Sequence, residues 1–454
     1  MIKEINKKQK IVLSVLLACA TVVGAFFLGF FVRSKTLPSE LEAMNYILSM
    51  YKKYYYEEES SDVIVDTFAS SLLDQYSDYY SKEDLELMHT ANKGGREGMG
   101  ISYNSSTNEI TGVSWNSPSD RAGIKPGGKI RAFKYDTDEF VTIVSPSEGG
   151  DKALGDIIEF IPDNEEFQFL IEYEGALKEF TVMRAGYTET FVRYYTSENE
   201  YGFREVDGDM QFVLIGENKT YDLKGRSDLA VIDYNGFAAL NNGLYGSVGQ
   251  MERALSQFKE DGKTNLILDL RNNGGGFMDI LQEVSAHFIG AENNTKNLVS
   301  VAKYKNDKEE EYYSAKVDYH DFSFESITVL ANSGTASASE VLIGAMLDYD
   351  FKNIVKVVIE GYSYKYANFD EDRIEIVTEY RTYGKGIMQT TYENPITQQA
   401  IKLTTAKIFW PITDISIHGR GVTTALNEEL NYSVQKIYNV SDNGAVYDAV
   451  ELSK

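Results

Sequence analysis

The pattern of hydrophobic and polar residues begins with one long apolar run. Residues 11–32 contain no charged side chain over 22 positions, and as a helix they would span about 33 Å, which is enough to cross a bilayer. Four lysines precede the run, whereas only Arg33 and Lys35 follow it closely. This bias predicts a membrane anchor with a cytoplasmic N-terminus and the bulk of the chain outside. A cleaved signal peptide is the alternative, although the run is long for one.

Helical periodicity follows the apolar run. Ser39 and Glu42 form a capping-box pattern, after which apolar residues recur at helical spacing, namely Leu41, Met44, Leu48, Tyr51 and Tyr55. A second helix is predicted over residues 62–74, with Val65, Phe68, Leu72 and Leu73 on one side. The sequence therefore predicts a helical region over residues 36–93, behind a cytoplasmic tip and anchor over residues 1–35. These helices could pair two protomers into a homo-oligomer or pack on the β-rich module of their own chain.

Residues 94–185 have a different pattern, with short alternating runs between glycine-rich turns. The runs fall at residues 100–103, 110–114 and 129–133, and the longer runs FQFLIEYEG and LKEFTVMR close the segment near Arg184. This pattern predicts a small β-rich domain. Residues 186–228 are polar and are interpreted as a linker.

The pattern changes again at Leu229. Apolar runs at residues 229–237, 265–270, 327–332 and 354–361 predict strands, and amphipathic segments between them predict helices. Alternating strands and helices predict βαβ units in a mostly parallel sheet covered on both faces, extending over residues 229–454. The expected fold is therefore a multidomain α+β and α/β protein. Sites in such sheets gather at the carboxyl ends of strands, where the loops DLRNNGGG and NSGTASASE lie.

Composition narrows the possible functions. A chain of 454 residues suits two or three domains, and its net charge of −25 argues against a nucleic-acid partner. The single cysteine, Cys19, lies in the apolar run, so the rest of the chain has no disulfide. The four histidines have no zinc-type spacing. No metal or other cofactor is expected.

Three loops carry candidate chemistry, and each has a structural interpretation as well. The pattern from Ser337 to Glu340 is a helix capping box, but four hydroxyls compete there and spacing does not choose among them: Ser333, Thr335, Ser337 and Ser339. The glycines at 274–276 form either a tight turn or a backbone pocket for an oxyanion. Lys385, between two glycines, is either a solvated loop residue or a functional amine.

In combination, the segments resemble the C-terminal processing peptidases, a family of Ser–Lys serine proteases with an embedded PDZ domain. The resemblance covers nearly the whole chain. Its motifs occur in this order: LLDQYSDYYSKEDLELM, GMGI with SPSDRAGIKPGGKI, LILDLRNNGGG, GTASASE, YGKGIMQ and LTTAKIFWPITDISIHGRGV.

The resemblance implies a role for each matched residue. Ser337 would be the nucleophile, Lys385 its general base and Gln389 the residue that orients the lysine, while the backbone N–H groups of Gly275 and Ala338 would form the oxyanion hole. Residues 94–185 would be the PDZ-like domain, and the amides around Gly98, Met99, Gly100 and Ile101 would bind the C-terminal carboxylate of a protein or peptide substrate.

The chain departs from the family pattern in one spacing, its proposed base requires a particular environment, and one alternative function is left open. The 48 residues from Ser337 to Lys385 exceed the family norm, and the excess is assigned to a surface excursion at residues 361–380. A lysine acts as a base only when uncharged, so Lys385 needs a dry pocket that lowers its pKa from about 10.4. The alternative function is a non-catalytic PDZ adaptor that binds C-terminal tails in the cell envelope.

Overall fold

The computed structural model describes residues 39–54, 61–92, 95–150, 154–159, 161–207, 209–238, 246–289, 296–315, 324–361, 367–370, 373–376 and 380–438. The chain divides into two compact units, Met1–Leu72 and Leu73–Lys454. The expected anchor at residues 11–32 lies outside the described residues. Among the helices that are described, none has the length and apolar character needed to cross a membrane.

The first unit contains two helices in its described part, α2 (Ser39–Tyr54) and α3 (Ser61–Ser70). Both were predicted from the 3.6-residue periodicity of their apolar positions. Helix α2 carries Lys52 and Lys53 in its last turn, where positive charge complements the helix dipole.

An eight-stranded sheet forms the centre of the second unit. Its strand order is β12-β11-β10-β13-β14-β17-β18-β23. The parallel half consists of β13 (Leu229–Tyr234), β14 (Asn265–Asp269), β17 (Ser326–Ala331), β18 (Val355–Gly361) and β23 (Val434–Tyr438). The antiparallel half consists of β10 (Val192–Tyr195), β11 (Asn199–Val206) and β12 (Asp209–Glu217). The first four parallel strands confirm the predicted ones.

The linker predicted at residues 186–228 is wrong. Strands β10 to β12 extend the central sheet beside β13 instead, and all four residues of β10 are buried. Their pattern in the sequence is weak because β11 mixes apolar with charged residues and most positions of β12 are exposed or only half-buried, as expected at the edge of a sheet.

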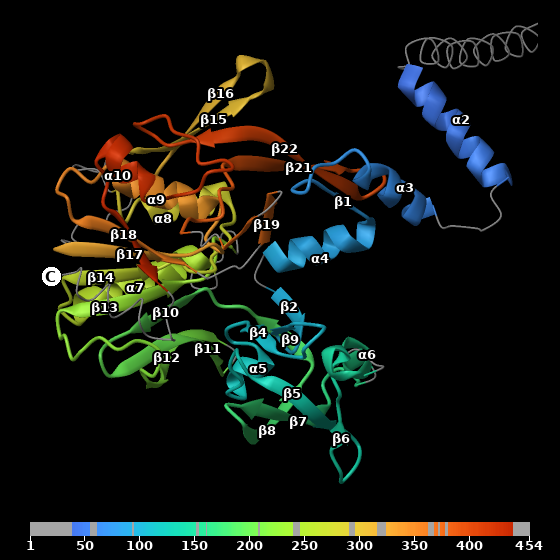
Figure 1. Ribbon diagram of the computed structural model, residues 1–454, viewed down its shortest axis with the longest axis horizontal. Helices are drawn as coiled ribbons and strands as arrows, with labels where there is room; N and C mark the ends of the chain where they lie inside the picture. Colours follow the sequence, from blue (N-terminus) through green and yellow to red (C-terminus); the bar gives the residue numbers. More distant parts are fainter. Residues whose placement is uncertain are drawn as a thin grey trace, which may run out of the picture. The chain divides into compact units, whose positions relative to one another are not determined.

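Helices α7 (Ser247–Glu260), α8 (Met278–Ser285) and α9 (Ala338–Asp348) share a single hydrophobic core with one face of this sheet, represented by Ala230 and Ile232. The opposite face is covered by Tyr221 and Leu223. Both faces are covered, as predicted, but α7, α8 and α9 all lie on the same face. The reason is that β13, β14, β17 and β18 lie side by side in sequence order (Figure 1). Right-handed crossovers that never reverse direction place every crossover helix on the same face.

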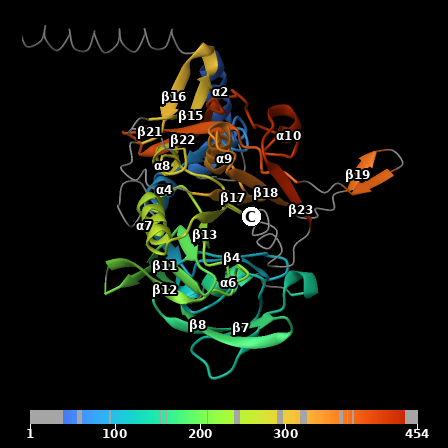
Figure 2. The ribbon, with the colours of Figure 1, turned by 90° about the vertical axis from the view of Figure 1, so that its left-hand side faces the viewer.

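A second, five-stranded sheet lies beyond these helices. It contains β1 (Asp78–Tyr80), β15 (Leu298–Tyr304), β16 (Glu309–Tyr313), β21 (Ile387–Asn394) and β22 (Gln399–Phe409), all antiparallel. Figures 1 and 2 both show α8 and α9 between the two sheets. The short helices η4 (Lys305–Asp307), α4 (Lys82–Asn92) and α10 (Ala425–Leu430) complete this region. The excursion assigned to residues 361–380 contains a hairpin, β19 (Ala367–Asp370) with β20 (Arg373–Ile376).

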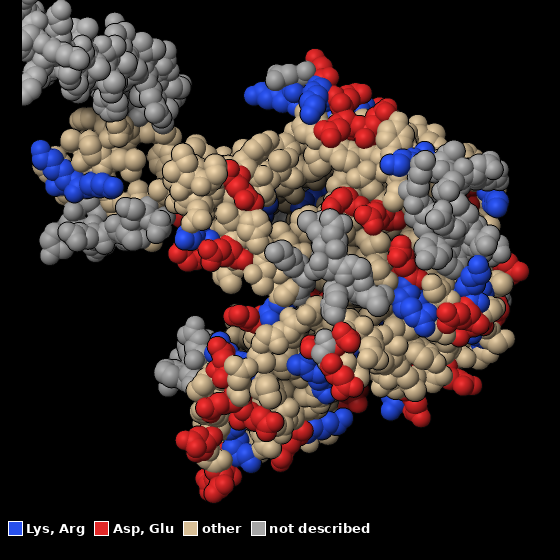
Figure 3. Space-filling model, turned by 180° about the vertical axis from the view of Figure 1, so that it is seen from behind, with Lys and Arg blue, Asp and Glu red and all other residues tan. Residues whose placement is uncertain are grey.

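The β-rich module has its own hydrophobic core, which includes Ile110, Ile124 and Phe169. Its strands are β2 (Gly95–Gly98), β3 (Ile101–Tyr103), β4 (Ile110–Val113), β5 (Lys129–Lys134), β6 (Val141–Thr142), β7 (Glu166–Tyr173), β8 (Ala176–Met183) and β9 (Ala185–Thr188). Its helices are α5 (Pro118–Arg121), η1 (Pro146–Glu148) and α6 (Leu154–Glu159). Figure 3 shows acidic side chains interspersed with fewer basic ones over the visible face of the molecule, in keeping with the net charge of −25.

A buried ion cluster joins this module to the central sheet. Asp120 of α5 accepts hydrogen bonds from Arg193 of β10 (2.7 Å) and from Arg204 of β11, and Arg193 also binds Glu200 (2.6 Å). Burial alone would raise the pKa of Asp120, but the two guanidinium groups hold it below its usual value. Loss of either partner would leave an uncompensated buried charge, so this contact is costly to break.

A second buried charge network lies at the carboxyl ends of three parallel strands. Arg271 binds Asp269 (2.6 Å) and Glu360 (3.1 Å), and the Tyr221 hydroxyl lies 2.8 Å from Asp269 and 3.1 Å from Asp233. Burial, and next the charge of Asp269, raise the pKa of Asp233 to about 7, although Arg271 opposes them. One guanidinium faces three carboxyl groups, so the protonated form of Asp233 is favoured at acidic pH.

We expect Asp233→Asn to stabilise the protein increasingly as pH rises. Because the folded pKa of Asp233 lies above its ordinary value, the proton stabilises the fold at low pH, and this contribution is lost as pH rises through about 7. Each pKa unit corresponds to about 1.4 kcal/mol. Thermal unfolding at pH 5 and pH 8 measures the effect, with exposed Asp209→Asn as control. A change in Tm equal at both pH values would contradict it.

Candidate active site

The serine-rich loop lies between the end of β17 and the start of α9, and the structure separates its four hydroxyls. Thr335 donates its hydroxyl proton to the carbonyl oxygen of Leu270 (2.7 Å), and Ser339 donates to that of Asn273 (3.0 Å). Both side chains are buried, so they join this loop to the glycine turn after β14. Ser333 and Ser337 remain as hydroxyls that these structural bonds do not use.

Ser337 has a strained backbone. It stands at the N-terminus of α9 with φ 57° and ψ −119°, a conformation that costs a non-glycine residue on the order of 1–3 kcal/mol and persists only where surrounding contacts impose it. The helix N-terminus also favours negative charge that develops beside it. These features fit a nucleophile presented on a sharp strand-to-helix turn.

Glu340 connects the serine loop to the lysine loop. Its buried carboxylate accepts hydrogen bonds from the backbone N–H groups of Ser337 (2.9 Å), Gly384 (2.8 Å) and Lys385 (2.9 Å), and from the Thr382 hydroxyl. Burial raises the pKa of Glu340 against the opposing effect of these donors. One carboxylate thus fixes the backbones of both predicted catalytic residues, although 48 residues separate them.

A further bond supports the same arrangement. The N–H of Tyr383 donates to the carbonyl oxygen of Thr335 (2.9 Å), which joins the lysine loop to the serine loop a second time. The insertion between Ser337 and Lys385 therefore leaves the two loops together, with the hairpin β19–β20 contained between them in the sequence.

Lys385 is half-buried, and its surroundings favour the neutral amine. Burial lowers its pKa and the like charge of Lys402 lowers it further, while Asp74 and Glu340 act in the opposite direction. Its Nζ lies 5.5 Å from the centroid of the Tyr76 ring. Among the described residues, the lysine forms no ion pair and no hydrogen bond to the Ser337 hydroxyl. The direction of this pKa shift is the one that a lysine base requires.

The predicted oxyanion donors lie side by side. A Cβ placed on Gly275 would fall 2.7 Å from the Ala338 nitrogen and 2.8 Å from the Ser337 Cβ, and its φ of 93° also favours glycine. Gly275 is therefore needed for the close approach of the glycine turn to the serine loop. Its own N–H donates to Asn273 Oδ1 (2.9 Å). In the described part of the chain no acceptor is found for the N–H of Ala338.

Gln389 lies in β21, at a bulge between Met388 and Gln389. Its side-chain amide donates to the Thr404 hydroxyl over 3.4 Å. The structure thus joins Gln389 to β22 and not to Lys385, so its orienting role stays a prediction.

The predicted peptide-binding loop lies between β2 and β3. Gly98 and Gly100 have φ values of 114° and 75°, and a Cβ on Gly100 would fall 2.2 Å from that of Ser117. Met99 is buried in the core of the module, and its carbonyl accepts the N–H of Ser119 (3.1 Å). Ile101 begins β3, which pairs with β4 on one edge. A cavity of about 180 Å³ adjoins Gly98.

Two residues of the site were not found from the sequence. Glu340 was recognised as a helix-capping residue, which its bond to the N–H of Ser337 confirms, but its bonds to the lysine loop depend on a contact across 45 positions. Tyr76 gave no signal, because it lies in a loop before β1 that reaches Lys385 only in the folded chain.

Comparison with known proteins identifies relatives of this chain. Residues 228–356 match the model of peptidase family S41. The "Probable CtpA-like serine protease" of Staphylococcus aureus (strain N315) is 26% identical over 413 residues, which are 89% of this chain and 68% of that protein. The protein of the same name from Staphylococcus epidermidis is 25% identical over 395 residues, 86% of this chain and 65% of that protein.

A solved structure is similar over most of its length. The photosystem II D1 C-terminal processing protease aligns with a TM-score of 0.45 at 18% identity, covering 86% of each chain. A separate PDZ domain of a carboxy-terminal protease from Vibrio cholerae matches 20% of this chain and 96% of its own, at 16% identity and a TM-score of 0.17.

Proposed function

Because residues 228–356 match peptidase family S41 and the chain is similar to CtpA-like serine proteases, we propose that it is a C-terminal processing endopeptidase that uses Ser337 as nucleophile and Lys385 as general base. The observation that carries the proposal is the Glu340 carboxylate, which accepts the backbone N–H groups of both residues. The lowered pKa of Lys385 supports the second requirement, because a lower pKa increases the fraction of the amine that is uncharged and able to accept a proton.

In the proposed reaction, Ser337 Oγ attacks the carbonyl carbon of the scissile bond while Lys385 Nζ accepts the hydroxyl proton. The N–H of Ala338 donates to the oxyanion, joined by the N–H of Gly275 once it leaves Asn273. Lys385 then donates its proton to the leaving amine, and water hydrolyses the acyl enzyme in a second step with the same groups. Gln389 orients the lysine.

The β-rich module supplies substrate selection. We assign it a PDZ-like role in which a peptide adds to the edge of β3 that β4 leaves unpaired, with its terminal carboxylate on the amides of residues 98–101. The positive φ values of Gly98 and Gly100 support this assignment, because they turn successive amides of the loop in one direction.

The apolar run at residues 11–32 places the enzyme at the cell membrane in this proposal. Its length and the excess of lysines before it support a single-pass anchor with residues 36–454 outside the cytoplasm. The substrates would then be extracytoplasmic proteins with accessible C-termini.

We expect Lys385→Ala to lower kcat about 10²- to 10⁴-fold on an unstructured peptide with an apolar C-terminal tail. In the wild type, kcat/KM should rise with pH as the amine deprotonates, and the midpoint of this rise should lie below the ordinary lysine pKa of 10.5. Lys402→Gln removes a like charge and should move the midpoint to higher pH, whereas Lys219→Gln, at an exposed site, should leave it unchanged. Tail binding by the wild type without cleavage would support the adaptor function instead.

A further inference from the structure

The second sheet has a gap along one edge of its longest strand. Strand β22 pairs with β21 along one edge, while the other edge is shared by β1, opposite residues 400–402, and β15, opposite residues 406–409. Between them, residues 403–405 have no strand partner on that side.

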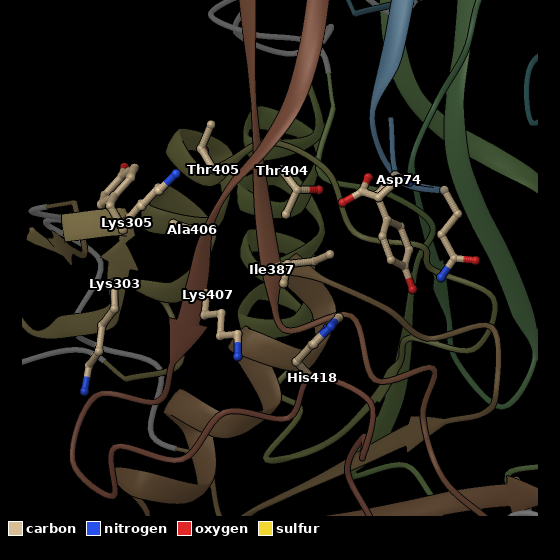
Figure 4. Close-up of a pocket in the computed structure, with 12 residues that line it drawn as sticks. Asp74, Lys303, Lys305, Ile387, Thr404, Thr405, Ala406, Lys407 and His418 are labelled. Atoms are coloured by element: carbon tan, nitrogen blue, oxygen red, sulfur yellow. Dashed lines mark hydrogen bonds between the residues drawn. The ribbon is translucent and has the colours of Figure 1, made fainter. Parts of the chain in front are cut away.

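A cavity of about 560 Å³ occupies this gap (Figure 4). Its floor includes Thr404, Thr405 and Ala406 of β22, and its walls come from the segment before β1, the end of β15 and the loop that carries His418. The N–H of Thr404 on this edge already donates to the Ser77 hydroxyl (2.9 Å), so the lysine side chains of the lining, and not the strand edge, are the groups that a ligand can reach.

The cavity is basic, although the chain as a whole is strongly acidic. Lys303, Lys305, Lys407 and His418 line it, with Asp74 as the only acidic residue of the lining. Lys303 is neutralised by Asp414 (2.7 Å) and turns away in Figure 4. Lys305 and Lys407, by contrast, form no ion pair with any carboxylate in the described part of the chain. Two lysines without an ion-pair partner among the described residues therefore line this cavity.

The cavity also borders the proposed general base. Tyr76, whose ring lies 5.5 Å from Lys385 Nζ, forms part of its wall, as does Ile387 two residues after that lysine. A neighbouring cavity of about 520 Å³ is lined by Gly384 and shares Gln75, Tyr76 and His418 with the first. Both cavities are lined by Tyr76, and each also includes a residue of the lysine loop or of the strand that follows it, Gly384 or Ile387.

We propose that the gap in β22 is a substrate subsite that binds a carboxylate through Lys305 and Lys407. The inference rests on the proposed peptidase function and adds a substrate preference to it. The carboxylate is either an acidic side chain near the scissile bond or the terminal carboxylate of the chain. Exposed ion pairs are weak and screened by salt, so two of them should give about a tenfold preference at low ionic strength.

The test measures binding separately from cleavage. Peptides that carry Glu or Gln at successive positions, each with a free or an amidated C-terminus, are titrated against the full-length protein in the Ser337→Ala background by fluorescence anisotropy. The same titrations use Lys305→Gln/Lys407→Gln in that background, and Lys178→Gln/Lys219→Gln as a matched loss of two exposed lysines on other elements. Thermal unfolding establishes that each variant is folded.

We expect the peptide with Glu at one position to bind about tenfold more tightly than the peptide with Gln there. This preference should disappear in the Lys305→Gln/Lys407→Gln variant, persist in the Lys178→Gln/Lys219→Gln control and weaken in 0.5 M salt. This result identifies a side-chain carboxylate. A preference for the free C-terminus that the same double variant reduces identifies the terminal carboxylate. The subsite is overturned if the double substitution reduces neither the preference for Glu nor the preference for a free C-terminus, because a free-C-terminus preference that survives it comes from the loop at residues 98–101. Failure of the wild type to cleave any peptide that binds would overturn the proposed function alone.

Discussion

Replacement of Ser337 by alanine is expected to lower kcat by about 10⁴-fold or more. The substitution removes the hydroxyl that attacks the substrate in the proposed mechanism, and no other group of the proposed site can take its place. The fold should be preserved. Ser337 is only partly buried, and the contact of its backbone N–H with Glu340 does not depend on the side chain.

The neighbouring hydroxyls provide matched controls. Ser333→Ala should keep most of kcat, because Ser333 is not on the strained turn at the start of α9 and its hydroxyl has no role in the proposed mechanism. Ser339→Ala should cost about 1 kcal/mol of stability through its lost bond to Asn273 and keep measurable activity. Cleavage of a quenched fluorescent peptide gives kcat for all three variants. Activity that survives Ser337→Ala and disappears with Ser333→Ala or Ser339→Ala would assign the nucleophile to another residue of the loop.

The second large effect is expected at Glu340. In Glu340→Gln, one of the two acceptor oxygens becomes an NH₂ group. This group is itself a donor and cannot accept the hydrogen bonds of the N–H and O–H groups that face it. Unsatisfied buried donors cost about 1–3 kcal/mol each, so the free energy of unfolding should fall by about 3 kcal/mol. The serine and lysine loops would separate, and kcat should fall at least 10²-fold even where the protein remains folded.

Urea unfolding and peptide cleavage together test this role. Glu217→Gln, an exposed carboxylate at the end of β12, is the control and should change neither quantity. A purely structural role predicts loss of stability with kcat unchanged for the folded fraction. A positioning role predicts that kcat falls while KM changes little, because the substrate cavities do not include Glu340. Full activity in a stable Glu340→Gln protein would contradict both roles.

Local pattern was sufficient for the elements that are apolar and continuous. The four parallel strands from β13 to β18 and the buried face of α7 at Met251, Leu255 and Phe258 follow directly from hydrophobic periodicity. Strands β7 and β8 were likewise recognised, because each runs for eight residues between turn signals. The candidate catalytic residues came from the resemblance to a known family that the combined motifs carry, and not from periodicity.

The arrangement of those elements depended on contacts that no local pattern contains. Strands β10 to β12 joined the central sheet through pairing with β13, and β1 joined β22 across more than 300 residues. Strand pairing is decided by backbone hydrogen bonds between distant segments, so polar strands at a sheet edge leave little signal in the sequence.

By itself, the sequence determined which residues this protein has available for chemistry: a serine after a strand, a lysine between glycines, a glycine turn, and too few histidines and cysteines for most other mechanisms. Only the tertiary structure decided which hydroxyls are used to hold loops together, which carboxylate joins Ser337 to Lys385, and which side chains surround the amine. The physical reason is that residue type fixes what a side chain can donate or accept, whereas burial and partners, which set its pKa and its role, come from segments far apart in the chain.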